Sequence, residues 1–143
     1  EMLRSLVGSE MCIRDRICAV SENQMAVLHI ECINEDEIID NVGMSAVQAK
    51  YWITLYDTEE GKKQWSSVPY TVSGYTIPET LLLRDMEING ELKKVLVVSV
   101  KDRIQLIDAE NGTVIQERIF REDIVNVVQA DKRRLLVGLS MEE

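Results

Sequence analysis

The sequence is poor in proline, histidine and aromatic residues, and it contains no long apolar run. Among 143 residues there are two prolines, one histidine and 5% aromatic residues. A helix that spans a bilayer needs about 20 consecutive apolar residues, so the sequence predicts no membrane-spanning segment. The single histidine, His29, is the only imidazole that a Ser-His-Asp or Cys-His arrangement in this chain could use.

Positive charge is also scarce, because 16 Lys and Arg stand against 25 Asp and Glu, which gives a formal net charge of −9. The basic residues occur singly or in short groups, which argues against a surface that follows a phosphate backbone. We therefore expect no nucleic-acid partner. Of the three cysteines, Cys12 lies in the N-terminal stretch set aside below. Cys18 and Cys32 are too few for a disulfide framework and too far apart for a zinc pair, so we expect free thiols and a cytoplasmic location.

The N-terminal stretch stands apart from the rest of the sequence. Residues 5–16 read SLVGSEMCIRDR, which resembles the conceptual translation of a transposase-type sequencing adaptor. Such a stretch is excluded before the fold is considered. We therefore expect residues 1–16 to be an artefact and residues 17–143 to be a fragment of a longer protein.

Short apolar runs rich in Val and Ile, separated by Gly, Asn and Asp, predict a chain made mostly of strands. The run VLVVSV at 95–100 is typical of a strand buried on both faces. Asn89-Gly90 stands between the runs 81–88 and 92–100 and predicts a hairpin. Residues 79–87 could also form a helical turn, but the segment is short and a strand follows it. Further strands are predicted at 25–33, 42–48, 52–57, 63–68, 103–108, 113–120, 124–129 and 135–140.

The sequence also repeats itself. Residues 53–61 (ITLYDTEEG) match residues 104–112 (IQLIDAENG) at an offset of 51, and residues 135–140 match 95–100 at an offset of 40. Repeats of this length suit a four-stranded blade. We therefore predict three units, at about 24–68, 80–120 and an incomplete 123–143. The segment 69–78 contains both prolines and is predicted to be a connecting loop.

The best-defined element of the repeat is a strand, an Asp, three residues, a Gly and a second strand, as at Asp57 to Gly61 and Asp108 to Gly112. The Asp can accept hydrogen bonds from the turn backbone, and the Gly can adopt positive φ. This pattern resembles β-propeller proteins of the WD-repeat or pyrroloquinoline-quinone-repeat kind. The resemblance implies an all-β fold, a partial β-propeller of about two and a half four-stranded antiparallel blades.

Few side chains are candidates for chemistry. His29 and Cys32 are three residues apart on a predicted strand, which places them on opposite faces and rules out a Cys-His pair. Tyr51, Trp52 and Tyr56 could line a ligand groove, but Trp52 and Tyr56 share a face of a predicted strand, and packing is the explanation we favour.

Two loop motifs have similarly simple explanations. The acidic loop 34–37 with Asp40 could gather a hard cation, but its spacing is not that of a calcium loop. Asn111 begins an Asn-Gly-Thr glycosylation pattern that the predicted turn already explains. We predict no catalytic, cofactor-binding or metal-binding residues.

The resemblance implies a non-catalytic platform for protein–protein interaction within a larger propeller-containing protein, with protein partners bound by exposed loops. One alternative is a fragment of a quinone-type propeller dehydrogenase, and another is a membrane or periplasmic assembly-factor propeller. The loop residues expected to face partners are Glu35, Asp36, Tyr70, Tyr75, Asp102 and Asp131.

Overall fold

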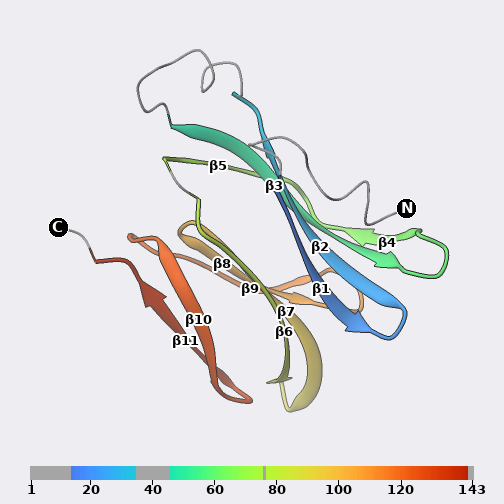
Figure 1. The fold of residues 1–143 in the computed structure, drawn as a ribbon. Helices are drawn as coiled ribbons and strands as arrows, with labels where there is room; N and C mark the ends of the chain where they lie inside the picture. Colours follow the sequence, from blue (N-terminus) through green and yellow to red (C-terminus); the bar gives the residue numbers. More distant parts are fainter. Residues whose placement is uncertain (1–13, 35–45, 76, 142–143) are drawn as a thin grey trace. The chain divides into compact units, whose positions relative to one another are not determined.

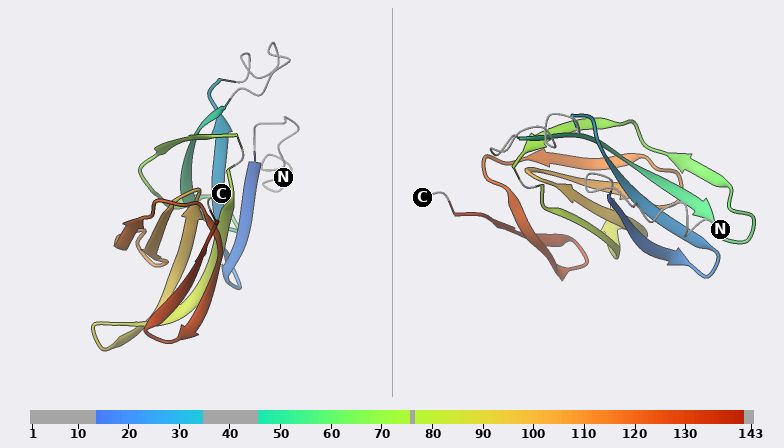
Figure 2. Two further views of the ribbon diagram at one scale, coloured as in Figure 1. Left: turned by 90° about the vertical axis from the view of Figure 1, so that its left-hand side faces the viewer. Right: turned by 45° about the horizontal axis from the view of Figure 1, so that its top comes forward.

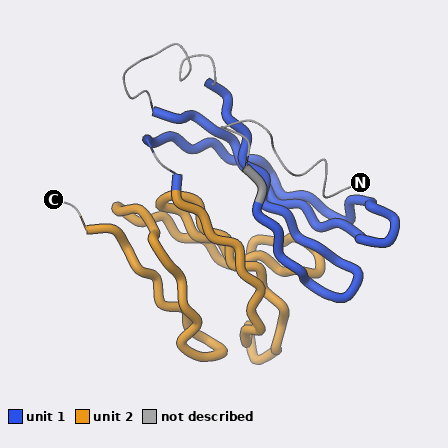
Figure 3. Tube along the Cα trace, in the orientation of Figure 1, with its two compact units in different colours: residues 1–77 blue, residues 78–143 orange. Residues whose placement is uncertain are grey.

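The computed structural model describes residues 14–34, 46–75 and 77–141, and these residues form eleven strands and no helix (Figure 1). The predicted all-β class is therefore confirmed, and every strand pair is antiparallel. The chain divides into two compact units, residues 1–77 and 78–143 (Figure 3).

Unit 1 contains one five-stranded sheet. Its strands β1 to β4 pair in chain order, and β5 pairs with β3 on the same edge as β4. β2 and β3 run together over nine paired residues and twist along their length, as Figure 2 shows from two further directions. The strands are β1 (Arg14–Ser21), β2 (Gln24–Cys32), β3 (Val47–Asp57), β4 (Lys63–Ser66) and β5 (Tyr70–Gly74).

Strand β1 begins inside the stretch that resembles an adaptor. Arg14, Asp15 and Arg16 pair with β2, and Ile17 continues the same pairing opposite Val27. Residues 1–13 lie outside the described residues. The predicted first unit at 24–68 did not include β1, although β1 supplies one edge of this sheet.

Two strand predictions in unit 1 are wrong. The ranges 42–48 and 52–57 were predicted as separate strands, but β3 runs without a break from Val47 to Asp57. The reason is that Gln48 to Ile53 alternate between more exposed and buried side chains, and no Gly or Pro interrupts them. Residues 42–45 lie outside the described residues.

The predicted connecting loop at 69–78 also contains a strand, because β5 pairs with β3 from Val47↔Gly74 to Tyr51↔Tyr70. The sequence Tyr-Thr-Val-Ser favours a strand, and Pro69 stands just before it, where no ladder hydrogen bond is lost. The two prolines flank this strand rather than mark one long loop.

Unit 2 contains a four-stranded sheet and a separate two-stranded hairpin. The four strands pair in chain order, which confirms the predicted meander. Residues 79–87 form a strand, as predicted, and not the helical turn that was the alternative. The strands are β6 (Glu79–Ile88), β7 (Glu91–Val100), β8 (Arg103–Asp108), β9 (Val114–Ile119), and the hairpin strands β10 (Ile124–Asp131) and β11 (Arg134–Leu139).

The hairpin that joins β6 to β7 is confirmed. Asn89 and Gly90 have φ values of 52° and 80°, and Ile88 pairs with Glu91 across the turn. Residues 95–100 of β7 are each at most 1% exposed, so this strand is buried on both faces as predicted.

The two Asp-to-Gly turns have the same geometry. The backbone N–H of Gly61 donates to the carbonyl of Asp57 at 2.8 Å, and that of Gly112 donates to Asp108 at 2.8 Å. Gly61 and Gly112 have φ values of 71° and 79°. The turns therefore confirm the predicted roles of the Asp and the Gly, and both sheets place this turn between their third and fourth strands in chain order.

A backbone hydrogen bond lies at the open end of each hairpin in unit 2. The N–H of Lys101 donates to the carbonyl of Pro78 beside the β6–β7 pair, and the N–H of Ser140 donates to the carbonyl of Asp123 beside the β10–β11 pair. The matched residues 95–100 and 135–139 both lie on the second strand of an antiparallel pair. The repeat at an offset of 40 stays a prediction.

Candidate functional site

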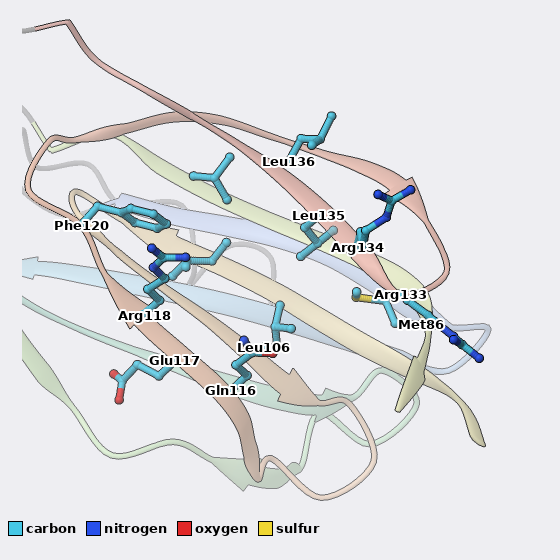
Figure 4. A pocket seen from close by; sticks show the side chains of 12 residues that line it. Met86, Leu106, Gln116, Glu117, Arg118, Phe120, Arg133, Arg134, Leu135 and Leu136 are labelled. Atoms are coloured by element: carbon cyan, nitrogen blue, oxygen red, sulfur yellow. The ribbon is translucent and has the colours of Figure 1, made fainter. Parts of the chain in front are cut away.

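A cavity of unit 2 lies between its four-stranded sheet and the β10–β11 hairpin (Figure 4). It has a volume of about 320 Å³ and opens to solvent. It adjoins the buried core that Met86, Ile104 and Leu106 form with Ile124 and Val127. The lining residues, named together below as the groove, are Met86, Ile104, Leu106, Gln116, Glu117, Arg118, Phe120, Arg133, Arg134, Leu135, Leu136 and Val137.

The alternation of side chains along β8 and β9 explains one wall. Ile104 and Leu106 are two residues apart, so they lie on one face of β8, and their partners on β9 are Arg118 and Gln116. This wall therefore combines buried apolar side chains with exposed polar ones. Phe120 follows β9 and is held there by the hydrogen bond from its N–H to Asp102 at 2.8 Å.

Strand β11 provides the opposite wall. Leu135 and Val137 lie on one face of β11 and pack against the core, whereas Leu136 points the other way and is 61% exposed. Leu136 lies directly opposite Val128 of β10, which is 53% exposed. The hairpin therefore presents an apolar outer face in addition to its inner face.

Three arginines surround the groove. The guanidinium of Arg118 lies 4.7 Å from the centroid of the Phe120 ring, a cation–π contact visible in Figure 4. Arg133 donates to Glu87 at 2.8 Å, and the Arg133 side chain is 74% exposed. Among the lining residues, these three arginines outnumber the carboxylate of Glu117, although Arg133 and Arg134 are paired with Glu87 and Asp131.

The remaining ion pairs near the groove hold its charges in place. Arg134 Nη2 lies 2.7 Å from Asp131 Oδ2. This hydrogen bond from Arg134, followed by one from the backbone N–H of Arg133, lowers the pKa of Asp131 below its ordinary value. The hydrogen bond to Glu87 raises the pKa of Arg133. Glu117, the carboxylate among the lining residues, pairs with Arg103. The exposed pair between Arg134 and Asp131 contributes little to the stability of the fold.

The residues considered for chemistry in unit 1 form an aromatic cluster. The ring of His29 stacks on Trp52 with centroids 5.0 Å apart and meets the edge of Tyr56 at 6.3 Å. Lys50 Nζ lies 5.6 Å from the centre of the Trp52 ring. Trp52 and Tyr56 therefore share a face, as predicted. Cys32 pairs in register with Ala49 and is not part of this cluster.

The acidic loop is described only at its start. Asn34 is 8% exposed, its amide donates to the carbonyl of Ala46 at 2.8 Å, and its Oδ1 accepts from the N–H of Gln48 at 2.8 Å. Asn34 therefore closes the two ends of the loop together. Residues 35–37 and Asp40 lie outside the described residues. In the described parts of the chain, no three His, Cys, Asp or Glu side chains come together as a metal site would require.

The expected loop residues are scattered rather than gathered. Tyr70 is not in a loop, because it begins β5 and its ring stacks on Tyr51 with centroids 5.7 Å apart. Tyr75 follows β5 and is 63% exposed, and Asp102 lies in the turn between β7 and β8. Asp131 ends β10 beside the groove. Glu35 and Asp36 lie outside the described residues.

Sequence reasoning missed the groove. Its walls come from β6, β8, β9 and β11, so no local motif contains its residues. The one available signal was the run Lys132-Arg133-Arg134 directly before an apolar strand, since it places positive charge at the end of a hairpin.

Between residues 14 and 141, with the two gaps named above, no helix has the length and apolar character that a membrane crossing requires. Comparisons with protein-family models, with curated proteins and with solved structures gave no match.

Proposed function

We propose that this chain is part of a β-propeller-type repeat protein whose role is to bind other proteins without catalysis. The groove of unit 2 is the surface that performs this role. The observation that carries the proposal is the cavity of about 320 Å³ between the sheet and the β10–β11 hairpin, with an apolar floor and three surrounding arginines. Seven of the twelve lining residues are apolar and five are polar or charged, and arginine and aromatic side chains such as Phe120 are enriched where proteins bind one another.

Two further features support the proposal. The repeated Asp-to-Gly turn is shared by two antiparallel sheets, as a repeat architecture requires. The apolar outer face of the hairpin, with Val125 57%, Val128 53% and Leu136 61% exposed, also suits contact with another polypeptide.

The test is a displayed library of random 12-residue peptides sorted against the whole chain. Binders are then measured against Gln116→Trp, which places a large ring in the groove from an exposed position on β9. The matched control is Val114→Trp, because Val114 is also exposed on β9 but does not line the groove.

We expect binders whose affinity falls at least about tenfold with Gln116→Trp, equivalent to about 1.4 kcal/mol, and is unchanged with Val114→Trp. A library that yields no binder, or binders that ignore Gln116→Trp, contradicts the proposal.

A further inference from the structure

We propose that Asn89 is a site of spontaneous chemical modification, at which the Asn-Gly turn between β6 and β7 converts asparagine to aspartate and isoaspartate. The chain has two Asn-Gly pairs, Asn89-Gly90 between β6 and β7 and Asn111-Gly112 between β8 and β9. The fold exposes the first pair to this reaction and protects the second. The reaction belongs to the turn itself and does not depend on the proposed function.

The reaction joins the backbone nitrogen of a glycine to the side-chain amide carbon of the asparagine before it, and it is one reason why asparagine is a thermolabile residue. The nitrogen of Gly90 loses its proton and attacks Cγ of Asn89. An N–Cγ bond forms, and the Cγ–Nδ2 bond breaks with release of ammonia. Water then opens the resulting cyclic imide at either carbonyl. One opening gives aspartate, and the other gives isoaspartate, in which the main chain continues through Cγ. The net change is hydrolysis of an amide, so water is the only co-reactant.

Both reacting groups of the first pair are open to solvent. Asn89 and Gly90 are exposed, and the strand pairing ends at Ile88 and Glu91 on either side of them. In the described part of unit 2, no hydrogen bond holds the Gly90 N–H or the Asn89 side chain. A Cβ added to Gly90 would meet no atom within 4 Å, so the space beside its backbone is empty. The Gly90 nitrogen is therefore available for attack without any prior opening of the fold.

The second pair is held by hydrogen bonds at both reacting groups. The N–H of Gly112 donates to the carbonyl of Asp108 at 2.8 Å, and Asn111 Oδ1 accepts from the N–H of Thr113 at 2.9 Å. Attack by the Gly112 nitrogen therefore requires that its hydrogen bond break first. One hydrogen bond of ordinary net strength corresponds to a factor of about five in rate, so Asn111 should react at least about fivefold more slowly than Asn89.

The turn that reacts lies beside a contact that fixes the β10–β11 hairpin. The N–H of Glu87 donates to the carbonyl of Lys132 at 2.7 Å, and the Glu87 carboxylate accepts from Arg133 at 2.8 Å. Isoaspartate adds one carbon atom to the main chain of a two-residue loop, and the register of a hairpin depends on the length of its loop. We therefore expect isoaspartate at position 89 to speed amide exchange at Glu87.

The experiment uses the full chain and peptide mapping. The chain is incubated at mildly alkaline pH, both native and in guanidinium chloride, and is sampled over time. Trypsin then releases the two sites in separate peptides, residues 85–93 and 104–118. Mass spectrometry measures the conversion of amide to acid, and carboxyl methylation by an isoaspartyl methyltransferase detects isoaspartate. We expect peptide 85–93 to convert at least about fivefold faster than peptide 104–118 in the native chain, and the two rates to become similar in the denatured chain.

Two variants test the site and the cause of the difference. Asn89→Gly removes the side chain that reacts and tolerates the positive φ of the turn, so peptide 85–93 should no longer form isoaspartate. Asp108→Ala removes the acceptor of a turn hydrogen bond from Glu110. It should speed conversion of peptide 104–118 about two- to fivefold and leave peptide 85–93 unchanged. Thermal melts confirm that each variant is folded, and Asp108→Asn replaces Asp108→Ala if the latter is not.

Three results would overturn the inference. They are equal rates for the two peptides in the native chain, faster conversion of peptide 104–118 than of peptide 85–93, and no conversion of peptide 85–93 in the native chain over a period in which the denatured chain converts. None of these results concerns peptide binding in the groove, so the proposed function would stand if this inference failed.

Discussion

The carboxylate of Asp108 accepts a hydrogen bond from the backbone N–H of Glu110 at 2.9 Å. The same carboxylate lies 3.4 Å from Lys93 Nζ on the neighbouring strand. Asp57 makes the equivalent turn bond to Glu59 at 2.9 Å. One short side chain thus fixes the turn between β8 and β9 and links it to β7.

Replacement of Asp108 should therefore loosen the turn. We expect Asp108→Ala to lower the free energy of unfolding by about 1 to 3 kcal/mol, because the Glu110 N–H and Lys93 both lose their partner. Asp108→Asn keeps an acceptor for the turn and should cost less. Glu110→Ala is the control, since it retains the backbone N–H. Urea unfolding measures all three, and an Asp108→Ala variant as stable as the control would contradict this role.

The turn between β6 and β7 should be sensitive to its glycine. Gly90 has a φ of 80°, and a Cβ added there would meet no atom within 4 Å. The cost of Gly90→Ala is therefore conformational, about 1 to 2 kcal/mol. Asn89→Gly, at a neighbouring φ of 52°, should change stability much less. Thermal melts of the two variants test this explanation. A similar loss of stability in both would mean that the turn tolerates no substitution, and not that Gly90 alone requires its positive φ.

The two leucines of β7 should differ strongly. Leu96 is 0% exposed and Leu92 is 55% exposed on the same strand. Leu96→Ala should cost about 2 to 5 kcal/mol because it leaves a cavity, whereas Leu92→Ala should be nearly neutral. Equal losses measured by urea unfolding would contradict the burial of Leu96.

Asp131 should contribute to the acid sensitivity of unit 2. Its pKa lies below the ordinary value of 3.8, chiefly because Arg134 donates a hydrogen bond to it. A depressed pKa in the folded state stabilises the fold above the pKa of the unfolded chain, and this contribution is lost as the pH falls through the folded-state pKa. In an NMR titration of the Asp131 carboxyl, Arg134→Gln should raise the midpoint toward the ordinary value. Arg121→Gln should leave it unchanged, and an unchanged midpoint in both variants would show that Arg134 is not the cause.

Features set by neighbouring residues could be predicted from the sequence. The Asn89-Gly90 hairpin, the turn from Asp108 to Gly112 and the bounds of β8 depend on local backbone preferences and on alternation. The burial of residues 95–100 follows from a run that has no polar face.

Features set by distant pairing could not be predicted in the same way. β5 was missed because two prolines and a glycine suggested a loop, whereas its paired residues in Val47–Tyr51 lie 19 to 27 positions earlier. The groove depends on where β11 lies against β8 and β9, which no local pattern encodes.

The sharing of β3 between two edge strands has a consequence for aggregation. β4 pairs with Thr54 to Tyr56 of β3, and β5 pairs with residues 47–51. Between them, the N–H of Ile53 donates to Ser67 Oγ at 2.9 Å and the carbonyl of Ile53 accepts from the N–H of Ser67 at 2.8 Å. Ser67 therefore hydrogen-bonds the backbone of β3 between the part that pairs with β4 and the part that pairs with β5. This edge of the sheet therefore consists of two short segments in different alignments, a poor template for the stacking of further chains.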